Sequence, residues 1–122
     1  MGRRHLTDTE AAAALRRGNQ VEQFLAREEV DGDVQIAWVT ASVPRSGEYR
    51  LRVHRVHDIG SSDVADLFEF PPVDETEQVG EGRVVAEGDT PELVLHAAGD
   101  HGALADHWVN EGVVADEYLD AR

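Results

Sequence analysis

The chain has 122 residues and a formal net charge of −14 at pH 7, because 25 acidic side chains oppose only 11 basic ones, all of them arginine. This charge argues against nucleic acid as a partner, since phosphates repel an acidic protein at ordinary salt, and the absence of cysteine excludes disulfides, thiolate nucleophiles and cysteine-ligated zinc. The length fits one domain over residues 1–122, and leucine, isoleucine, valine and phenylalanine make up about a quarter of the chain, which is enough for a folded core.

A helix is predicted near the amino end, starting after a capping box over Thr7 to Glu10. In such a box the threonine hydroxyl accepts a hydrogen bond from the backbone N–H three residues on, and the glutamate accepts one from the threonine N–H. The alanine-rich residues 11–15 favour helix, and Gly18 is a typical stop. A helix that continues to Glu29 is the alternative, because several small or apolar residues would share one face. We favour the stop, with a short strand after it.

The middle of the chain is predicted to be β-structure. Residues 34–43 are rich in valine, threonine and tryptophan, and residues 48–59 alternate apolar with polar side chains. Pro44 to Gly47 form a turn signal between these two segments. The pattern predicts an antiparallel hairpin.

Two further segments are candidates for the same sheet. Residues 64–70 are predicted as a strand that ends at two prolines, and residues 74–82 as an acidic loop. Residues 83–87 are predicted either as a last short strand or as an extended lead into the next helix.

The carboxyl end is predicted to be helical. Asp89 and Thr90 are both N-cap candidates for a helix that runs to Ala98, with proline in its first turn. A break at Gly112 precedes a closing helix over residues 113–121. The complete order predicts an α+β fold: an antiparallel sheet of about four strands, with the N-terminal helix and two C-terminal helices packed on one face.

The strand over residues 48–59 carries the densest group of basic side chains. Alternation places its apolar side chains against the helices and its basic ones toward water or another subunit. The apolar residues are Tyr49, Leu51 and Val53, and the basic ones are Arg50, Arg52 and His54. Arginine binds carboxylate or phosphate through two nitrogens, so this group predicts a site for an anionic ligand or an acidic partner. Cross-strand pairing with acids such as Glu22 or Glu69 is the alternative, and the more common use of such arginines.

A second candidate site lies near the end of the chain. The polar residues Asn110 and Glu111 interrupt an apolar run that begins with Trp108. Such an interruption can orient a ligand, or it can place Asn110 as the N-cap of the closing helix. Trp108 and Trp38 are expected in the core, although either could anchor an interface.

No catalytic residue, metal or cofactor is predicted. The sequence has no P-loop and no GxGxxG, GxSxG or HExxH motif. His54 and His57 would point to opposite faces of a strand, which makes them a poor metal pair. The remaining metal candidates are His96, Asp100, His101 and His107. We interpret these four as solvated surface side chains.

The composition is typical of proteins adapted to high salt. A dense carboxylate surface stays hydrated where molar salt shortens the Debye length to about 3 Å. An acidic protein with an ordinary GC-rich coding bias is the alternative. No run approaches 18 apolar residues, so we expect no membrane span and a cytoplasmic location.

The absence of catalytic motifs leads to our first hypothesis, a small acidic protein without catalytic activity that acts through protein–protein contact or as a homo-oligomer. The alternative is a binding protein or enzyme for an anionic small molecule, with a pocket between the sheet and the C-terminal helices. The candidate binding residues are Arg50, Arg52, His54, Trp108, Asn110 and Glu111.

Overall fold

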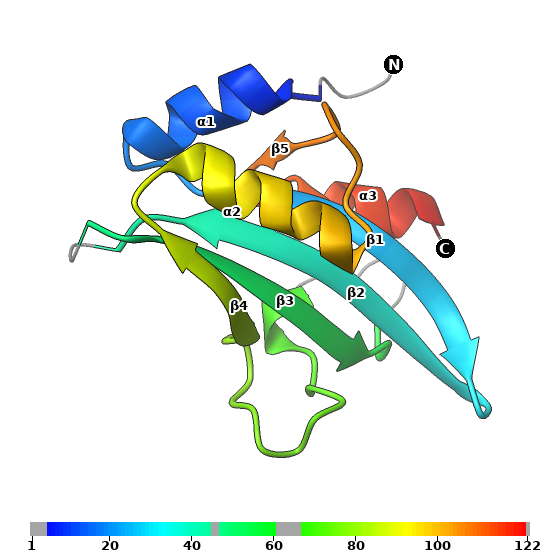
Figure 1. Cartoon of the computed structure of the whole chain (residues 1–122). Coiled ribbons are helices and arrows are strands. Elements are labelled where there is room, and N and C mark those ends of the chain that lie inside the picture. Colours follow the sequence, from blue (N-terminus) through cyan, green and yellow to red (C-terminus); the bar gives the residue numbers. More distant parts are fainter. Residues whose placement is uncertain (1–4, 45–46, 61–66, 122) are drawn as a thin grey trace.

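The computed structural model describes residues 5–44, 47–60 and 67–121 (Figure 1). In chain order its elements are α1 (Asp8–Arg16), β1 (Val21–Val30), β2 (Asp33–Ser42), β3 (Tyr49–His57), the 3₁₀ turn η1 (Leu67–Glu69), β4 (Arg83–Gly88), α2 (Pro91–Ala98), the 3₁₀ turn η2 (Gly99–His101), β5 (Val109–Asn110) and α3 (Val114–Ala121). The five strands form one antiparallel sheet in the order β4-β3-β2-β1-β5. The predicted α+β class is confirmed, with five strands because the short β5 adds an edge.

Helix α1 ends where glycine allows the chain to turn. The predicted capping box is present, since Thr7 Oγ1 accepts from the Glu10 N–H and Glu10 Oε1 accepts from the Thr7 N–H, both at 3.1 Å. Gly18 has a φ of 86°, and β1 begins three residues later with the buried Val21. The predicted end of the helix near Gly18 is therefore confirmed, and the alternative helix that continues to Glu29 is not formed.

Two hairpins connect the three long strands. Asp31 and Gly32 join β1 to β2 with φ values of 53° and 83°, the positive values that a two-residue type I′ hairpin needs. The pairing of β2 with β3 confirms the predicted hairpin and sets Gln35 opposite His57.

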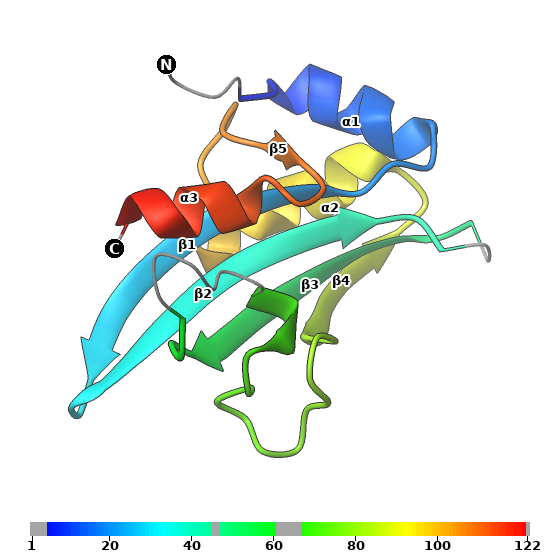
Figure 2. The ribbon, with the colours of Figure 1, turned by 180° about the vertical axis from the view of Figure 1, so that it is seen from behind.

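The sheet separates two apolar cores (Figures 1 and 2). The first core lies between the sheet and the helices α1 and α2, and it includes Leu15, Val39, Leu51, Val94 and Trp108. The second lies under η1 and α3 and includes Ile36, Trp38, Phe70, Val114 and Tyr118. The expected packing of all helices on one face is therefore right for α1 and α2 and wrong for α3. The reason is that β2 carries apolar side chains on both faces, so both faces need a cover.

The segment predicted as a strand over residues 64–70 has a different structure. Residues 64–66 lie outside the described residues, and Leu67–Glu69 form η1. A strand would point Leu67 and Phe70 to opposite sides, whereas a 3₁₀ turn places residues three apart on the same side. Both side chains are buried in the second core, so their joint burial favours the turn.

The elements after the acidic loop agree more closely with those predicted from the sequence. The strand β4 is present, and Thr90 is the N-cap of α2. The Thr90 hydroxyl accepts a hydrogen bond from the Leu93 N–H at 3.4 Å. Residues 104–108 form no helix, and α3 begins at Val114. None of the described helices is long and apolar enough to cross a membrane.

One end of the sheet extends beyond the helices. In Figures 1 and 2 the hairpin of β1 and β2 reaches past α1, α2 and α3 toward its turn at residues 31–32. The last four residues of β1, Arg27 to Val30, are all exposed. We call residues 26–30, 33–35 and 55–57 the open sheet end.

Candidate functional site

The predicted basic group on β3 lies on the face opposite α1 and α2, as expected. Arg50 Nε lies 3.5 Å from Glu87 Oε2 of the neighbouring strand β4. Arg52 Nη1 donates to the backbone carbonyl of Glu81 at 3.0 Å. Both arginines therefore make contacts within the chain, but to Glu87 and Glu81 rather than to the predicted Glu22 or Glu69.

His54 does not face water or another subunit, so this part of the prediction is wrong. The residue is only 4% exposed. Its ring stacks on the indole of Trp38, Phe68 packs edge-on against it with a centroid distance of 5.5 Å, and its Nε2 lies 3.0 Å from Thr40 Oγ1. Alternation along β3 gives the face but not what covers it, and here the turn η1 brings Phe68 over the ring.

The environment of His54 keeps its ring uncharged. Burial disfavours the charged form and Arg52 repels it, which lowers the pKa of His54 to about 4. The ring is then neutral at pH 7 and a weak base. This arrangement suits a packed core side chain better than a proton acceptor or an anion ligand.

The second predicted group does not converge on a shared site. Trp108 is buried in the first core, and its Nε1 donates to Asp8 Oδ1 at 3.1 Å. Asn110 lies in β5 opposite Val21, and Glu111 is exposed. Trp108 and Trp38 are both core residues, as expected.

The beginning of α3 is bound by a residue that the sequence did not indicate. The Gly112 N–H donates to Glu22 Oε1 at 2.9 Å, and Gln20 Nε2 donates to Glu22 Oε2 at 2.9 Å. Glu22 is fully buried, and this burial raises the pKa of its carboxyl while the hydrogen bonds partly oppose the rise. A carboxylate of β1, and not the Asn110 side chain, therefore serves the amides at this helix end.

The histidines do not form a metal centre in the part of the chain that the structure describes. No group of three or more His, Cys, Asp or Glu side chains there is arranged to hold an ion. His107 lies beside His5, with ring centroids 5.1 Å apart. His54 and His57 point to opposite faces, since His54 packs in the second core and His57 contacts Asp33.

A row of polar side chains crosses the open sheet end on the face that α1 and α2 cover elsewhere. Asp33 Oδ2 lies 2.7 Å from His57 Nδ1 and accepts from Gln35 Nε2 at 3.1 Å. Gln35 Oε1 accepts from Arg55 Nη1 at 2.7 Å, and Arg55 Nη2 donates to Glu28. We call these five residues, from β1, β2 and β3, the polar row.

Within the polar row, the Arg55 guanidinium is ion-paired with one of the two carboxylates, that of Glu28. Two carboxylates, one guanidinium and one imidazole are joined by hydrogen bonds and remain partly exposed. Asp33 orients the His57 ring as an aspartate orients a histidine base in a catalytic triad, but the row contains no hydroxyl or thiol to act as nucleophile. The sequence pattern does not indicate this row, because its residues come from three strands and meet only in the observed register, which places Gln35 opposite His57.

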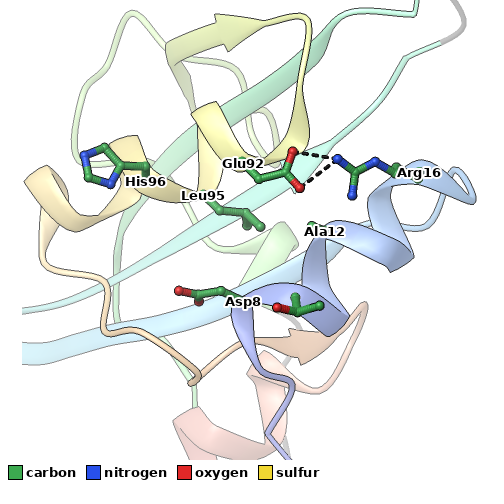
Figure 3. A pocket seen from close by; sticks show the side chains of 7 residues that line it. Asp8, Ala12, Arg16, Glu92, Leu95 and His96 are labelled. Atoms are coloured by element: carbon green, nitrogen blue, oxygen red, sulfur yellow. Dashed lines mark hydrogen bonds and ion pairs between the residues drawn. The ribbon is translucent and has the colours of Figure 1, made fainter.

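A groove runs between α1 and α2 (Figure 3). It encloses about 330 Å³, and Arg16 Nη2 donates to both carboxylate oxygens of Glu92 beside it, at 2.6 and 2.7 Å. A second hollow of about 310 Å³ shares Asp8, Leu95 and His96 with the groove and reaches Trp108. Of the six predicted binding residues, only Trp108 contributes to either hollow.

Comparison with known proteins gives no family for this chain. No family model, curated protein or solved structure matches it.

Proposed function

We propose that this chain acts by protein–protein contact, without a catalytic activity of its own, and that it makes the contact through the open sheet end. The observation that carries the proposal is the outer edge of β1. In the described part of the chain, β5 pairs only with Val21 and Glu22, so no described strand pairs with residues 23–30 on the side away from β2.

An unpaired strand edge presents backbone N–H and C=O groups that another chain can bind. Here the edge continues into a face that none of the described helices covers, where the polar row and the exposed Val30 offer hydrogen bonds and a small apolar contact. Mixed polar and apolar side chains of this kind are ordinary in non-obligate protein interfaces.

The arginines support contact over the binding of an anionic metabolite. Arg50 is ion-paired with Glu87, Arg52 donates to the Glu81 carbonyl, and Arg55 is paired with Glu28 in the polar row. An anion would have to displace these contacts, on a chain whose net charge is −14.

The test combines the mass in solution with a paired substitution. Light scattering at about 0.1 and 2 M KCl, together with a pulldown from a lysate in the same salt, should show a self-associated species or a retained protein partner. Val30→Asp should weaken that association. Val79→Asp is the matched control, because Val79 is also an exposed valine but lies in the acidic loop. A strict monomer without any partner at either salt, or equal effects of the two variants, contradicts the proposal.

A second candidate function is the binding of a small polar molecule in the groove between α1 and α2. The groove volume lies at the small end of the range for ligand sites, and Arg16 and His96 line it. A thermal-shift screen with phosphorylated and carboxylated metabolites tests this function, since a ligand raises the melting temperature by mass action. A flat response, or an equal response from Arg16→Gln, counts against the groove.

A further inference from the structure

We infer that the partner at the open sheet end is a second copy of this chain, which pairs antiparallel along residues 26–30 of β1 in one register. This inference rests on the proposed function, and it adds the identity of the partner and the residues that face each other.

Residues 26–30 form a regular strand segment. A bulge at Leu25 interrupts the β1–β2 register, and pairing then continues from Ala26 opposite Ala37 to Val30 opposite Asp33. The segment begins four residues after the last β1 position that β5 pairs in the described chain. The segment thus keeps the regular strand alternation that pairing on the side away from β2 requires.

Symmetry limits how two copies can pair. A two-fold axis perpendicular to the sheet keeps the same face upward in both copies, so residues opposite each other must point to the same face. Only registers in which the two residue numbers have the same parity satisfy this condition. The register centred on Glu28 places Arg27 opposite Glu29 of the second copy, and Ala26 opposite Val30 of the second copy.

The charges along β1 favour this register over its neighbours. It forms two symmetry-related Arg27–Glu29 contacts. Centring the axis on residue 27 instead sets Arg27 opposite Arg27 of the second copy, and centring it on residue 29 sets Glu29 opposite Glu29 of the second copy. Opposite charges across a strand pair stabilise it and like charges destabilise it. The one like-charge contact, between the two Glu28 side chains, is moderated because Arg55 of the same chain pairs with each.

In the structure the Arg27 side chain is bound within its own chain. Its Nε donates to Asp58 Oδ2 at 2.7 Å, and the Asp58 side chain is only 3% exposed. Because Asp58 follows β3, two strands inward from the open edge, the Arg27 side chain has to turn outward to meet Glu29 of the second copy.

The net charge predicts how salt acts on this dimer. Two copies that each carry −14 repel each other, and salt screens this repulsion over about 10 Å at 0.1 M but about 3 Å at 1 M. We therefore expect the dimer fraction to rise with KCl. Association that weakens as KCl rises contradicts this expectation.

The absence of cysteine makes the register directly measurable. In Glu28→Cys the introduced thiol is the only one in each chain, and in the dimer the thiols of the two chains face each other across the axis. Paired antiparallel residues have Cα atoms about 4.5–5.5 Å apart, within the range that a disulfide bridges. In Glu29→Cys the two thiols are offset along the strand and lie roughly 8 Å apart, which is too far.

Mild oxidation followed by a non-reducing gel gives the result. We expect a covalent dimer from Glu28→Cys in about 2 M KCl, and little from Glu29→Cys or from Val84→Cys, which places an exposed thiol on the β4 edge. Equal cross-linking by the three variants overturns the inference. A dimer by light scattering without the Glu28→Cys cross-link rejects this register but leaves the contact function standing. A monomer that still retains another protein rejects the second copy as partner.

A charge reversal provides an independent readout. Glu29→Arg should lower the dimer fraction several-fold, because it sets two arginines against each other. Glu75→Arg changes the net charge equally at an exposed position of the acidic loop and should leave the dimer intact or strengthen it. An equal loss from both reversals contradicts the proposed pairing.

Discussion

The imidazole of His54 lies flat on the indole of Trp38, with ring centroids 4.7 Å apart and planes 2° from parallel. This stack joins β3 to β2 in the second core, and Phe68 packs edge-on against both rings. The protein thus uses a titratable side chain as a packing element. Its acid sensitivity follows from that use.

We predict that His54 makes the fold less stable in mild acid. Its pKa is about 4 in the folded chain and 6.5 when unperturbed, so the unfolded state binds more protons between these values. The free energy of unfolding should therefore be fully present above pH 6.5 and fall as the pH drops toward 4, by at most about 3 kcal/mol. Urea unfolding of the wild type and of His54→Phe across this range measures the difference. Parallel pH profiles for the two proteins contradict the assignment.

We predict that Glu22 stabilises α3 mainly by accepting hydrogen bonds. Glu22→Ala should cost about 2 kcal/mol, because it leaves the Gly112 N–H and the Gln20 amide without this acceptor. Glu22→Gln keeps an oxygen and removes the buried charge, so it should change stability by less than about 1 kcal/mol once the Gln20 amide flips.

The contribution of Glu22 to the free energy of unfolding should also depend on pH. Because the folded pKa of Glu22 is raised, its contribution is largest below its ordinary pKa of 4.5 and is lost as the pH rises through the folded value. Glu22→Gln should lack that component. Unfolding curves for the two variants that coincide at neutral pH would count against the capping role.

We predict that Gly82 tolerates a side chain poorly. Its φ is 68°, and an added Cβ would lie 2.7 Å from the His54 ring and 2.9 Å from the Val53 carbonyl. Gly18→Ala is the matched control, because Gly18 also has a positive φ but has open space around it. Left-handed strain alone costs about 1 kcal/mol, and the close contacts should make Gly82→Ala about 2 kcal/mol worse than the control by thermal unfolding. Equal losses would show that the loop moves aside.

We predict that the Tyr118 hydroxyl fastens α3 to the sheet. It donates to Asp58 Oδ1 at 2.6 Å, and the other Asp58 oxygen accepts from Arg27. Tyr118→Phe removes a hydrogen bond to a charged group and should cost about 2 kcal/mol. Tyr49→Phe, in a half-buried tyrosine of β3, should change stability by less than about 0.5 kcal/mol. Similar losses in urea unfolding would contradict this role of the hydroxyl.

The features that the sequence predicted correctly have local causes. The capping box spans Thr7 to Glu10, and the turn at Gly18 needs one glycine. The strand that contains Leu51 and Val53 alternates within one segment, so its apolar face could be assigned from residue types alone. These signals act over a few positions, and nothing distant in the chain overrides them.

The features that the sequence did not predict depend on contacts between distant segments. The cover over His54 comes from η1, and the acceptor at the start of α3 comes from Glu22, 90 residues before Gly112. The location of α3 follows from β2 being apolar on both faces, which the sequence shows only as a short continuous apolar stretch from Ile36 to Val39. A short apolar run of this kind does not tell which element covers each face.

The two cores on opposite sides of the sheet also suggest how the molecule opens. Each core has its own helices, and the strands between them contribute side chains to both. The layer of η1 and α3 can therefore detach as a cooperative unit while α1 and α2 remain packed, and the reverse holds as well. We expect two subglobal units that exchange separately, and the amides of β2 belong to both.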